Sequence, residues 1–329
     1  MQRILLSITA ALLIAGCNQT APKEEGHSNG AAKPTTEVLN FRIAAQKGAS
    51  SSPMLYAKAK GYVEEELKKD YPDVKVTWSI FPHGPAVNES FAAGQQDVGL
   101  AGNVPTTISK ASGQKTVIFA KAAGGPAVIG LIVHKDSPVK VPADLKGKSV
   151  ACVRGGFSHH LLYLILKEAG LTFKDVYLVN LPNADIGTAV ETKQVDAGVI
   201  WEPGLSKTLS NGQTIQLRDG AGFKSNGTFY YVTESFAQKN PKALSAFVRA
   251  IGRAAKEIKE NPAAGAEVVK SEMDVPIDVL TKLYSKYDFR TELNQDDIDE
   301  LKDVEKFLSS EGLIKNRVDV DKFVVPVKL

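Results

Sequence analysis

The sequence predicts an α/β protein with two lobes. Short apolar segments of the kind that form strands alternate with segments of helical spacing, which favours sheets covered by helices. The chain has 329 residues, and at about 100–200 residues per domain this length corresponds to two domains. Hydrophobic residues make up 43% and charged residues 23%, which excludes a disordered chain, a collagen and a coiled coil. The net charge of +3 gives no electrostatic reason to expect nucleic acid as a partner.

The first two thirds of the chain carry the alternating pattern. The predicted strands are FRIAA (41–45), VKVTWSI (74–80), VGLA (98–101), TVIFA (116–120), SVACV (149–153), 176–181, GVIW (198–201) and TIQL (214–217). The predicted helices between the first four strands cover residues 53–67, 86–93 and 104–112. This order of elements is typical of mostly parallel sheets.

The last hundred residues carry mainly helix signals. The pairs Asn240–Pro241 and Asn261–Pro262 each combine an N-cap residue with a first-turn proline. A later apolar face with helical spacing consists of Ile298, Leu301, Val304 and Leu308. Its outer side is acidic and holds Asp296, Asp297, Asp299, Glu300 and Asp303. We expect this acidic side to face solvent rather than to form a docking patch.

Two segments of the chain resemble each other. SFAAGQQDVGLAGN (90–103) and TAVETKQVDAGVIWE (188–202) both read as a helix end, a turn with an aspartate, and an apolar strand. Asp97 and Asp196 occupy matching positions in the two segments. Two similar α/β lobes are the simplest explanation, although coincidence over so few positions is the alternative.

Two long extended runs, 128–135 and 229–234, are predicted to join the lobes. The first lobe would then consist of residues 38–127 and 235–329, and the second of residues 128–234. A double crossover makes a hinge, and a cleft between hinged lobes is a preferred ligand site.

The N-terminus is predicted to be a lipoprotein signal peptide, residues 1–16. Arg3 precedes the apolar run 4–15, which as a helix would span only about 18 Å of a hydrocarbon core about 30 Å thick. The residues IAGC (14–17) resemble a bacterial lipobox, which implies lipidation of Cys17. The alternative is ordinary secretion with an accidental cysteine. Polar residues 17–37 are predicted to be a flexible tether.

Motifs of catalysis and metal binding are absent from the sequence. There is no G-x-G-x-x-G, G-x-S-x-G, H-E-x-x-H or C-x-x-C motif. The adjacent His159 and His160 point to different sides of a predicted helix, so they cannot form an i, i+4 metal pair. Cys152 lies in an apolar strand, where we expect a buried, inert side chain. We therefore expect no catalytic residue, no metal site and no cofactor.

Five loops lead from a predicted strand or turn into a helix. They are 46–53, 81–85, 102–105, 154–159 and 201–203. Such loops gather at the carboxyl ends of parallel strands, and the free N–H groups of a helix start attract an anion. In any single loop, helix capping and turn formation are sufficient to explain the serine and glycine residues. Together the loops favour an anion site in a cleft between the lobes.

A family resemblance agrees with this pattern. Its motifs are QKG (46–48), FPHGP (81–85), SFAAGQQDVGLAGNVP (90–105), DLKGKSVACVRGGFSHHLLYLILKEAGL (144–171), LPNADIGTAV (181–190) and VDAGVIWEP (195–203). They resemble the lipoprotein solute-binding proteins of nitrate/sulfonate/taurine ABC importers, and most closely the aliphatic sulfonate-binding branch. The resemblance implies a type II periplasmic-binding-protein fold that closes around one small anion and delivers it to a permease.

The resemblance also implies the ligand-binding residues. They are Gln46, Ser51, Ser52, Asn103, Ser158, His159, Trp201 and Glu202, with His83 at the rim. The chain departs from the family pattern at Lys193, where glycine is usual, and at Gly155–Ser158, where small hydroxyl residues are common. We expect the second departure to affect which headgroup or tail fits.

The expected solute is an aliphatic sulfonate, and taurine, nitrate or another small anion is the alternative. A carboxylate at Glu202 suits a solute with an ammonium group and repels nitrate. An enzyme or a sensor on the same bilobed fold is a further alternative. The expected partners are the permease with its ATPase and, through the lipid on Cys17, a membrane; the protein is expected to be an extracytoplasmic monomer.

Overall fold

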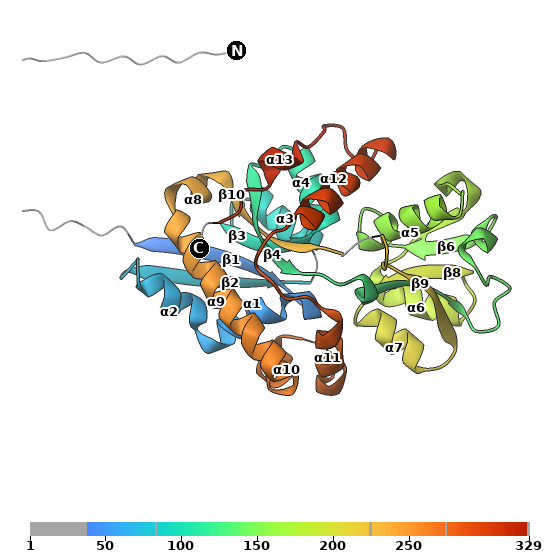
Figure 1. Cartoon of the computed structure of the whole chain (residues 1–329), viewed down its shortest axis with the longest axis horizontal. Helices are drawn as coiled ribbons and strands as arrows, with labels where there is room; N and C mark the ends of the chain where they lie inside the picture. The colour runs from blue at the N-terminus through green and yellow to red at the C-terminus, as the bar shows by residue number, and fades with distance from the viewer. Residues whose placement is uncertain (1–37, 83, 224–225, 274, 328–329) are drawn as a thin grey trace, which may run out of the picture. The chain divides into compact units, whose positions relative to one another are not determined.

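The described part of the chain contains two five-stranded sheets (Figure 1). The structure is a computed structural model that describes residues 38–82, 84–223, 226–273 and 275–327. The predicted signal peptide (1–16), the tether (17–37) and the lipidation of Cys17 lie outside the described residues, as does His83. No helix in the described ranges is long and apolar enough to cross a membrane.

The first sheet has the strand order β2-β1-β3-β10-β4. Its strands are β1 (Leu39–Gln46), β2 (Val74–Phe81), β3 (Val98–Gly102), β4 (Thr116–Ala123) and β10 (Thr228–Thr233). Strand β1 runs parallel to β2 and β3, whereas β10 is antiparallel to β3 and β4.

The second sheet has the order β7-β6-β8-β5-β9. Its strands are β5 (Ile129–His134), β6 (Ser149–Cys152), β7 (Tyr177–Asn180), β8 (Ala197–Trp201) and β9 (Thr214–Asp219). Strand β6 is parallel to β7 and β8, and β5 is antiparallel to β8 and β9. Each sheet therefore has one antiparallel strand in the fourth place, and the α/β prediction is confirmed.

The two extended runs expected to join the lobes are strands. The run 229–234 lies mostly within β10, which pairs inside the first sheet, so the chain returns to that sheet before Thr228 rather than after residue 234. The run 128–135 contains β5 of the second sheet. A strand that is buried on both faces requires a continuous apolar run. Burial within a sheet therefore explains the two runs better than a linker between the lobes.

Helices cover the sheets. Their bounds are α1 (Ser52–Lys60), α2 (Tyr62–Lys68), α3 (Gly84–Ala92), α4 (Asn103–Ala111), α5 (Phe157–Glu168), α6 (Asn183–Glu191), α7 (Gly204–Ser210), α8 (Glu234–Lys239), α9 (Pro241–Glu260), α10 (Pro262–Val269), α11 (Ile277–Leu283), α12 (Gln295–Ser310) and α13 (Val320–Phe323). Short 3₁₀ turns are η1 (Ala49–Ser51), η2 (Pro126–Val128), η3 (Pro142–Leu145), η4 (Phe173–Asp175), η5 (Lys270–Glu272) and η6 (Tyr284–Lys286). The helix predicted over 53–67 is divided into α1 and α2 by Gly61, whose φ of 70° lies in the left-handed region that favours glycine.

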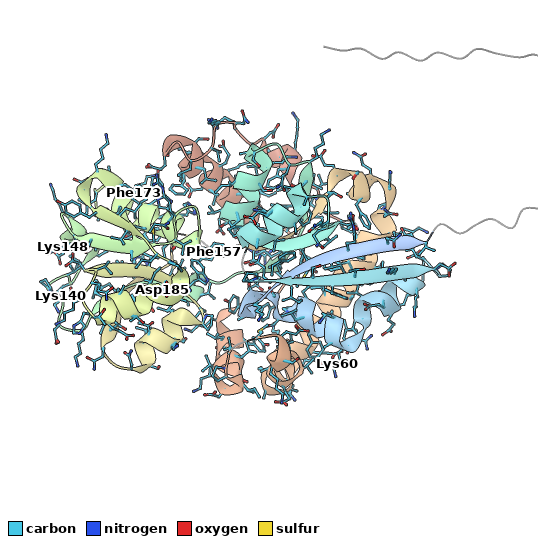
Figure 2. The ribbon with its side chains drawn as sticks, turned by 180° about the vertical axis from the view of Figure 1, so that it is seen from behind. Lys60, Lys140, Lys148, Phe157, Phe173 and Asp185 are labelled. Atoms are coloured by element: carbon cyan, nitrogen blue, oxygen red, sulfur yellow. The ribbon has the colours of Figure 1, made fainter. Side chains whose placement is uncertain are left out.

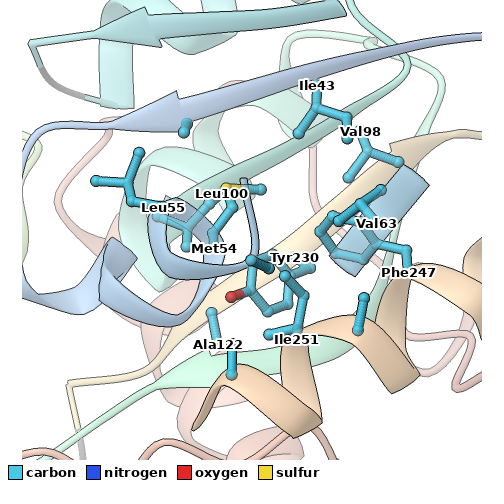
Figure 3. Close-up of a cluster of buried hydrophobic side chains, with 14 of the residues drawn as sticks. Ile43, Met54, Leu55, Val63, Val98, Leu100, Ala122, Tyr230, Phe247 and Ile251 are labelled. Atoms are coloured by element: carbon cyan, nitrogen blue, oxygen red, sulfur yellow. The ribbon is translucent and has the colours of Figure 1, made fainter. Parts of the chain in front are cut away.

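The main hydrophobic core lies between the first sheet and the helices α1, α2 and α9 (Figure 3). Side chains of strands and helices meet there, namely Ile43, Val98 and Leu100 from strands and Met54, Phe247 and Ile251 from helices. A second cluster packs α3 and α13 on the opposite face of the sheet. The second sheet is covered by α5 on one face and by α6 and α7 on the other.

Equivalent aspartates confirm the similarity of the two lobes. Asp97 accepts hydrogen bonds from the backbone N–H and guanidinium of Arg42 in β1. Asp196 accepts hydrogen bonds from the backbone N–H and hydroxyl of Ser149 in β6. Each aspartate thus connects the start of the third strand in sheet order (β3 or β8) to the second (β1 or β6).

The unusual Lys193 has a structural explanation in the same repeat. It lies three residues before Asp196, as Gly94 lies three residues before Asp97. Gly94 has a φ of 67° and Lys193 a φ of 59°. A lysine in this left-handed conformation is strained by about 1–2 kcal/mol relative to an ordinary helical conformation.

The acidic side of α12 does not face solvent along its whole length, as the sequence had suggested. Asp297 is fully buried and receives hydrogen bonds from Lys121 of β4 and from Arg290. Glu300 is buried and receives one from the backbone N–H of Gly227. The prediction was wrong because partners distant in sequence compensate these charges in the interior.

Candidate functional site

The loop from β1 to α1 contains two unsatisfied hydroxyl groups. Ser51 and Ser52 are fully buried, and their Oγ atoms have no hydrogen-bond partner among the described residues. They lie at the start of α1, where Pro53 occupies the first turn and the positive end of the helix dipole is located. An unpaired buried hydroxyl costs about 1–3 kcal/mol, so two of them at a helix start point to a missing acceptor.

Tyr284 supplies a third hydroxyl beside Ser52. Its side chain is buried at η6, and its oxygen also has no hydrogen-bond partner in the described part of the chain. Burial raises the pKa of Tyr284 to about 12, with a small opposing effect from the Ser52 hydroxyl. The tyrosine therefore keeps its proton at neutral pH and can donate a hydrogen bond. Sequence reasoning missed Tyr284 because it lies in the helical last third, outside every motif.

Two other predicted residues of the first lobe have partners within the chain. The side-chain amide of Gln46, at the end of β1, donates to the carbonyl of Leu100. Asn103 is fully buried, with its Oδ1 accepting from the N–H of Val104 at 2.7 Å and its Nδ2 donating to Glu300. Asn103 therefore connects the start of α4 to α12.

The corresponding loop of the second lobe uses the polar atoms of Ser158 and His159 to accept hydrogen bonds from its own backbone. The Oγ of Ser158 accepts from the N–H of Val153 at 2.9 Å, and the Nδ1 of His159 accepts from the N–H of Gly155 at 3.3 Å. Burial, with the nearby charges of Arg154 and His160, lowers the pKa of His159 to about 4. His159 is thus neutral at pH 7.

Aromatic side chains of the second lobe contact the first. Phe157 lies against Gly102 at the end of β3, where an added Cβ would be only 2.2 Å from the Cζ of Phe157 (Figure 2). The same ring packs edge-on to Trp201, with 6.2 Å between ring centroids. The Phe157 ring leaves no room for a Cβ atom at position 102, so this residue has to be glycine. The ring lies between the two sheets.

A second set of contacts joins α5 to α12. The ring of His159 lies 5.3 Å from that of Phe307, and the ring of His160 lies 5.0 Å from it. The Nε2 of His160 is 3.0 Å from the Oδ2 of Asp303. The lobes are therefore held together by packed rings and by polar contacts.

Trp201 and Glu202 lie at the carboxyl end of β8, as predicted. The side chain of Asn183 pairs with the backbone N–H and carbonyl of Trp201. The Glu202 side chain is fully buried, accepts from the N–H and hydroxyl of Ser206, and forms an ion pair with Lys286. Lys286 belongs to η6, so this ion pair connects the second lobe to the turn that also carries Tyr284.

Other candidate sites in the described residues give less support for a function. Cys152 is buried, and burial raises the pKa of its thiol to about 12, which agrees with the expected inert side chain. No group of three metal-ligating side chains is found within the described ranges. An open hollow of about 460 Å³ beside α12 and α13, lined by residues such as Lys306 and Arg317, includes none of the predicted ligand-binding residues.

A family model described as NMT1/THI5 like matches residues 49–265. The chain belongs to this family. The matched range includes Ser51, Ser52 and Glu202 but ends before Tyr284 and Lys286.

Individual proteins and solved structures are also similar to this chain. A relative from Escherichia coli, whose name provisionally assigns it to aliphatic sulfonates, is 37% identical over 210 residues, covering 64% of this chain and 63% of the relative. The crystal structure of the periplasmic aliphatic sulphonate binding protein from Escherichia coli has a TM-score of 0.79 and 27% identity, and the match covers 88% of this chain and 92% of that one. The alkanesulfonate-binding protein from Xanthomonas axonopodis bound to MOPS has a TM-score of 0.75 and 25% identity, covering 90% and 100%. The periplasmic-binding-protein fold implied by the resemblance is confirmed.

Proposed function

We propose that this chain is the extracytoplasmic solute-binding component of an ABC importer and that it binds a small sulfonate-type organic anion between its lobes. The observation that carries the proposal is the likeness of fold and sequence to sulfonate-binding proteins over almost the whole described chain. The three unpaired hydroxyls of Ser51, Ser52 and Tyr284 support it, because a sulfonate offers three acceptor oxygens.

The proposed binding mode assigns different roles to the two lobes. The hydroxyls and the positive end of α1 would hold the headgroup in the first lobe. Phe157 and Trp201 would form an apolar wall for the tail in the second. Ser158 and His159 have their polar atoms engaged by the N–H groups of Val153 and Gly155, so in this proposal they position the loop that carries Phe157. Gln46 and Asn103 position the ends of β1 and β3, and a role for His83 at the rim stays a prediction.

Binding would couple to closure of the lobes without a chemical step. A ligand shifts the balance between open and closed forms only by its higher affinity for the closed form. Donors from the first lobe and the aromatic wall from the second can contact the same ligand only when the lobes are closed. The closed form therefore has the higher affinity for the ligand. The closed form would then be presented to the permease and its ATPase.

Membrane attachment is the second part of the proposal. The sequence IAGC (14–17) supports cleavage before Cys17 and lipidation of its thiol, with residues 17–37 as the tether. A Cys17→Ser variant should pass from the membrane fraction to the soluble extracytoplasmic fraction. Recovery of this variant with the membranes, to the same extent as the parent protein, would contradict a lipid anchor.

A thermal-shift screen of the purified protein tests the function. The ligands are alkanesulfonates, taurine, nitrate, bicarbonate and sulfate, because a ligand that binds only the native state raises the unfolding midpoint. At a concentration 100 times Kd the stabilisation is about 2.7 kcal/mol. At least one alkanesulfonate should give a clear rise. Strong stabilisation by a non-sulfonate, with none by any sulfonate, would overturn the assignment.

A further inference from the structure

We propose that Lys286 is a specificity-determining residue that makes the site select sulfonates whose tail carries no positive charge. This inference rests on the proposed function and names the class of sulfonate. It follows from the way in which Lys286 neutralises Glu202, the carboxylate beside the proposed apolar wall.

The carboxylate of Glu202 is already occupied by groups of this chain. Its Oε2 accepts from the N–H of Ser206 at 2.9 Å, and its Oε1 accepts from the hydroxyl of Ser206 at 2.8 Å. The ammonium of Lys286 donates to the same Oε1 and lies 3.3 Å from the Ser206 hydroxyl. Both oxygens have partners, and the negative charge is balanced by a positive charge.

The position of Lys286 connects this ion pair to the proposed headgroup site. Lys286 ends the η6 turn that begins with Tyr284, whose unpaired hydroxyl lies beside Ser52. On the other side of the pair, Glu202 directly follows Trp201, which packs on Phe157. An anion bound at Ser51, Ser52 and Tyr284 would therefore extend its tail toward Trp201 and Glu202.

The charge balance decides which tail fits. A solute with a terminal ammonium, such as taurine, needs a carboxylate to replace the water that it loses on binding. The carboxylate closest to Trp201 in sequence is held by Lys286, so the ammonium would have to compete with a lysine that is part of the chain. It would also meet the like charge of that lysine. A methyl-terminated tail of the same length meets the aromatic wall without either penalty.

Propane-1-sulfonate and taurine form a matched pair for the test, since they differ mainly in a terminal methyl against an ammonium. We expect the full mature protein to bind propane-1-sulfonate about 100-fold more tightly than taurine in calorimetry, as for a buried charge without its partner. In Lys286→Met the carboxylate of Glu202 becomes available, and this ratio should fall by about tenfold or more. The control Lys286→Arg keeps the positive charge and should keep the ratio.

Two further variants keep the test decisive if Lys286→Met folds poorly. Glu202→Gln leaves the lysine charge unbalanced, so taurine should be rejected at least as strongly as by the parent protein. Lys286→Met combined with Glu202→Gln removes both charges, and the gain in taurine binding seen with Lys286→Met should disappear.

The outcomes separate this inference from the proposed function. Equal affinities of the parent protein for the two ligands would overturn the role of Lys286 while leaving sulfonate binding intact. The role of Lys286 would also be overturned if the ratio of the two affinities were unchanged in Lys286→Met, or if Glu202→Gln bound taurine better than the parent protein does. Failure of the parent protein to bind any sulfonate would instead remove the proposed function itself.

Discussion

The loops that follow β1 in the first sheet and β6 in the second occupy equivalent places but use their hydroxyl groups differently. After β1, Ser51 and Ser52 are buried with unpaired Oγ atoms. After β6, the Oγ of Ser158 accepts from the N–H of Val153, and the Nδ1 of His159 accepts from the N–H of Gly155. Strands β1 and β6 each lie second in their sheet and run parallel to both neighbours, so the difference comes from the residues of the loops and not from the local topology.

This difference shows how two loops at equivalent places of a repeated fold can have different roles in ligand binding. Unpaired donors stabilise the folded chain less than paired ones, and they are kept where a ligand can supply the acceptor. The loop of the first lobe is therefore suited to hold an anion. The loop of the second lobe, whose polar side-chain atoms are already hydrogen-bonded, is suited to present Phe157 to Gly102 and to close the structure.

The largest effect is expected from removing the unpaired hydroxyls. Ser51→Ala with Ser52→Ala should weaken binding of propane-1-sulfonate by at least about 100-fold, because each hydrogen bond to a charged group contributes about 1.5–3 kcal/mol and two are lost. The ligand-free unfolding midpoint should stay the same or rise. The matched control is Ser158→Ala, which should lower stability by about 1 kcal/mol through loss of the hydrogen bond from the Val153 N–H and change affinity little. An equal loss of affinity in the control would show that the two loops bind the anion alike.

A smaller effect is expected at the contact between Phe157 and Gly102. In Gly102→Ala the new Cβ collides with the ring, and overpacking costs of about 1–3 kcal/mol correspond to a loss of affinity of roughly tenfold or more, since closure is hindered. Adding Phe157→Ala removes the collision and should restore closure. Small-angle scattering of both variants with and without ligand measures closure directly. Failure of the second substitution to restore compaction would contradict a contact made on closing.

The neutral state of His159 predicts a dependence of stability on pH. Its pKa in the folded chain is about 4, below the ordinary value of 6.5. Between these values the unfolded chain binds more protons, so stability falls as the pH is lowered through this window. From pH 7 to 5.5 the loss should be about 1 kcal/mol. His159→Phe keeps the ring contacts with Phe173 and Phe307, and urea unfolding should show a weaker pH dependence; an unchanged dependence would assign the effect to other groups.

The smallest effect is expected where the repeats differ at one backbone position. Lys193→Gly should stabilise the protein by roughly 0.5 kcal/mol, because glycine adopts the left-handed conformation without strain but loses more chain entropy on folding. Gly94→Ala at the equivalent position should destabilise it by about 1 kcal/mol. Chemical unfolding measures both. A loss of stability in Lys193→Gly would mean that its side chain makes a contact of greater value than the strain.

Most secondary structure could be predicted from the sequence, because periodicity and turn residues are local. The eight segments taken as strands all form strands, and the aspartates of the repeat occupy equivalent places. The prediction was wrong for the run 229–234, since an apolar extended segment has the same pattern whether it crosses between lobes or lies in a sheet. It was also wrong for the acidic side of α12, where the buried Lys121 reverses the usual cost of burying a carboxylate.

The α/β order, the internal repeat and the loops at the carboxyl ends of the strands follow from local sequence patterns. Which polar atoms of those loops are hydrogen-bonded within the chain depends on the tertiary structure. It also brought Tyr284 to Ser52 and Lys286 to Glu202, across more than 80 residues in each case. Hydrogen bonding and charge balance depend on neighbours in space, and local patterns record only neighbours in sequence.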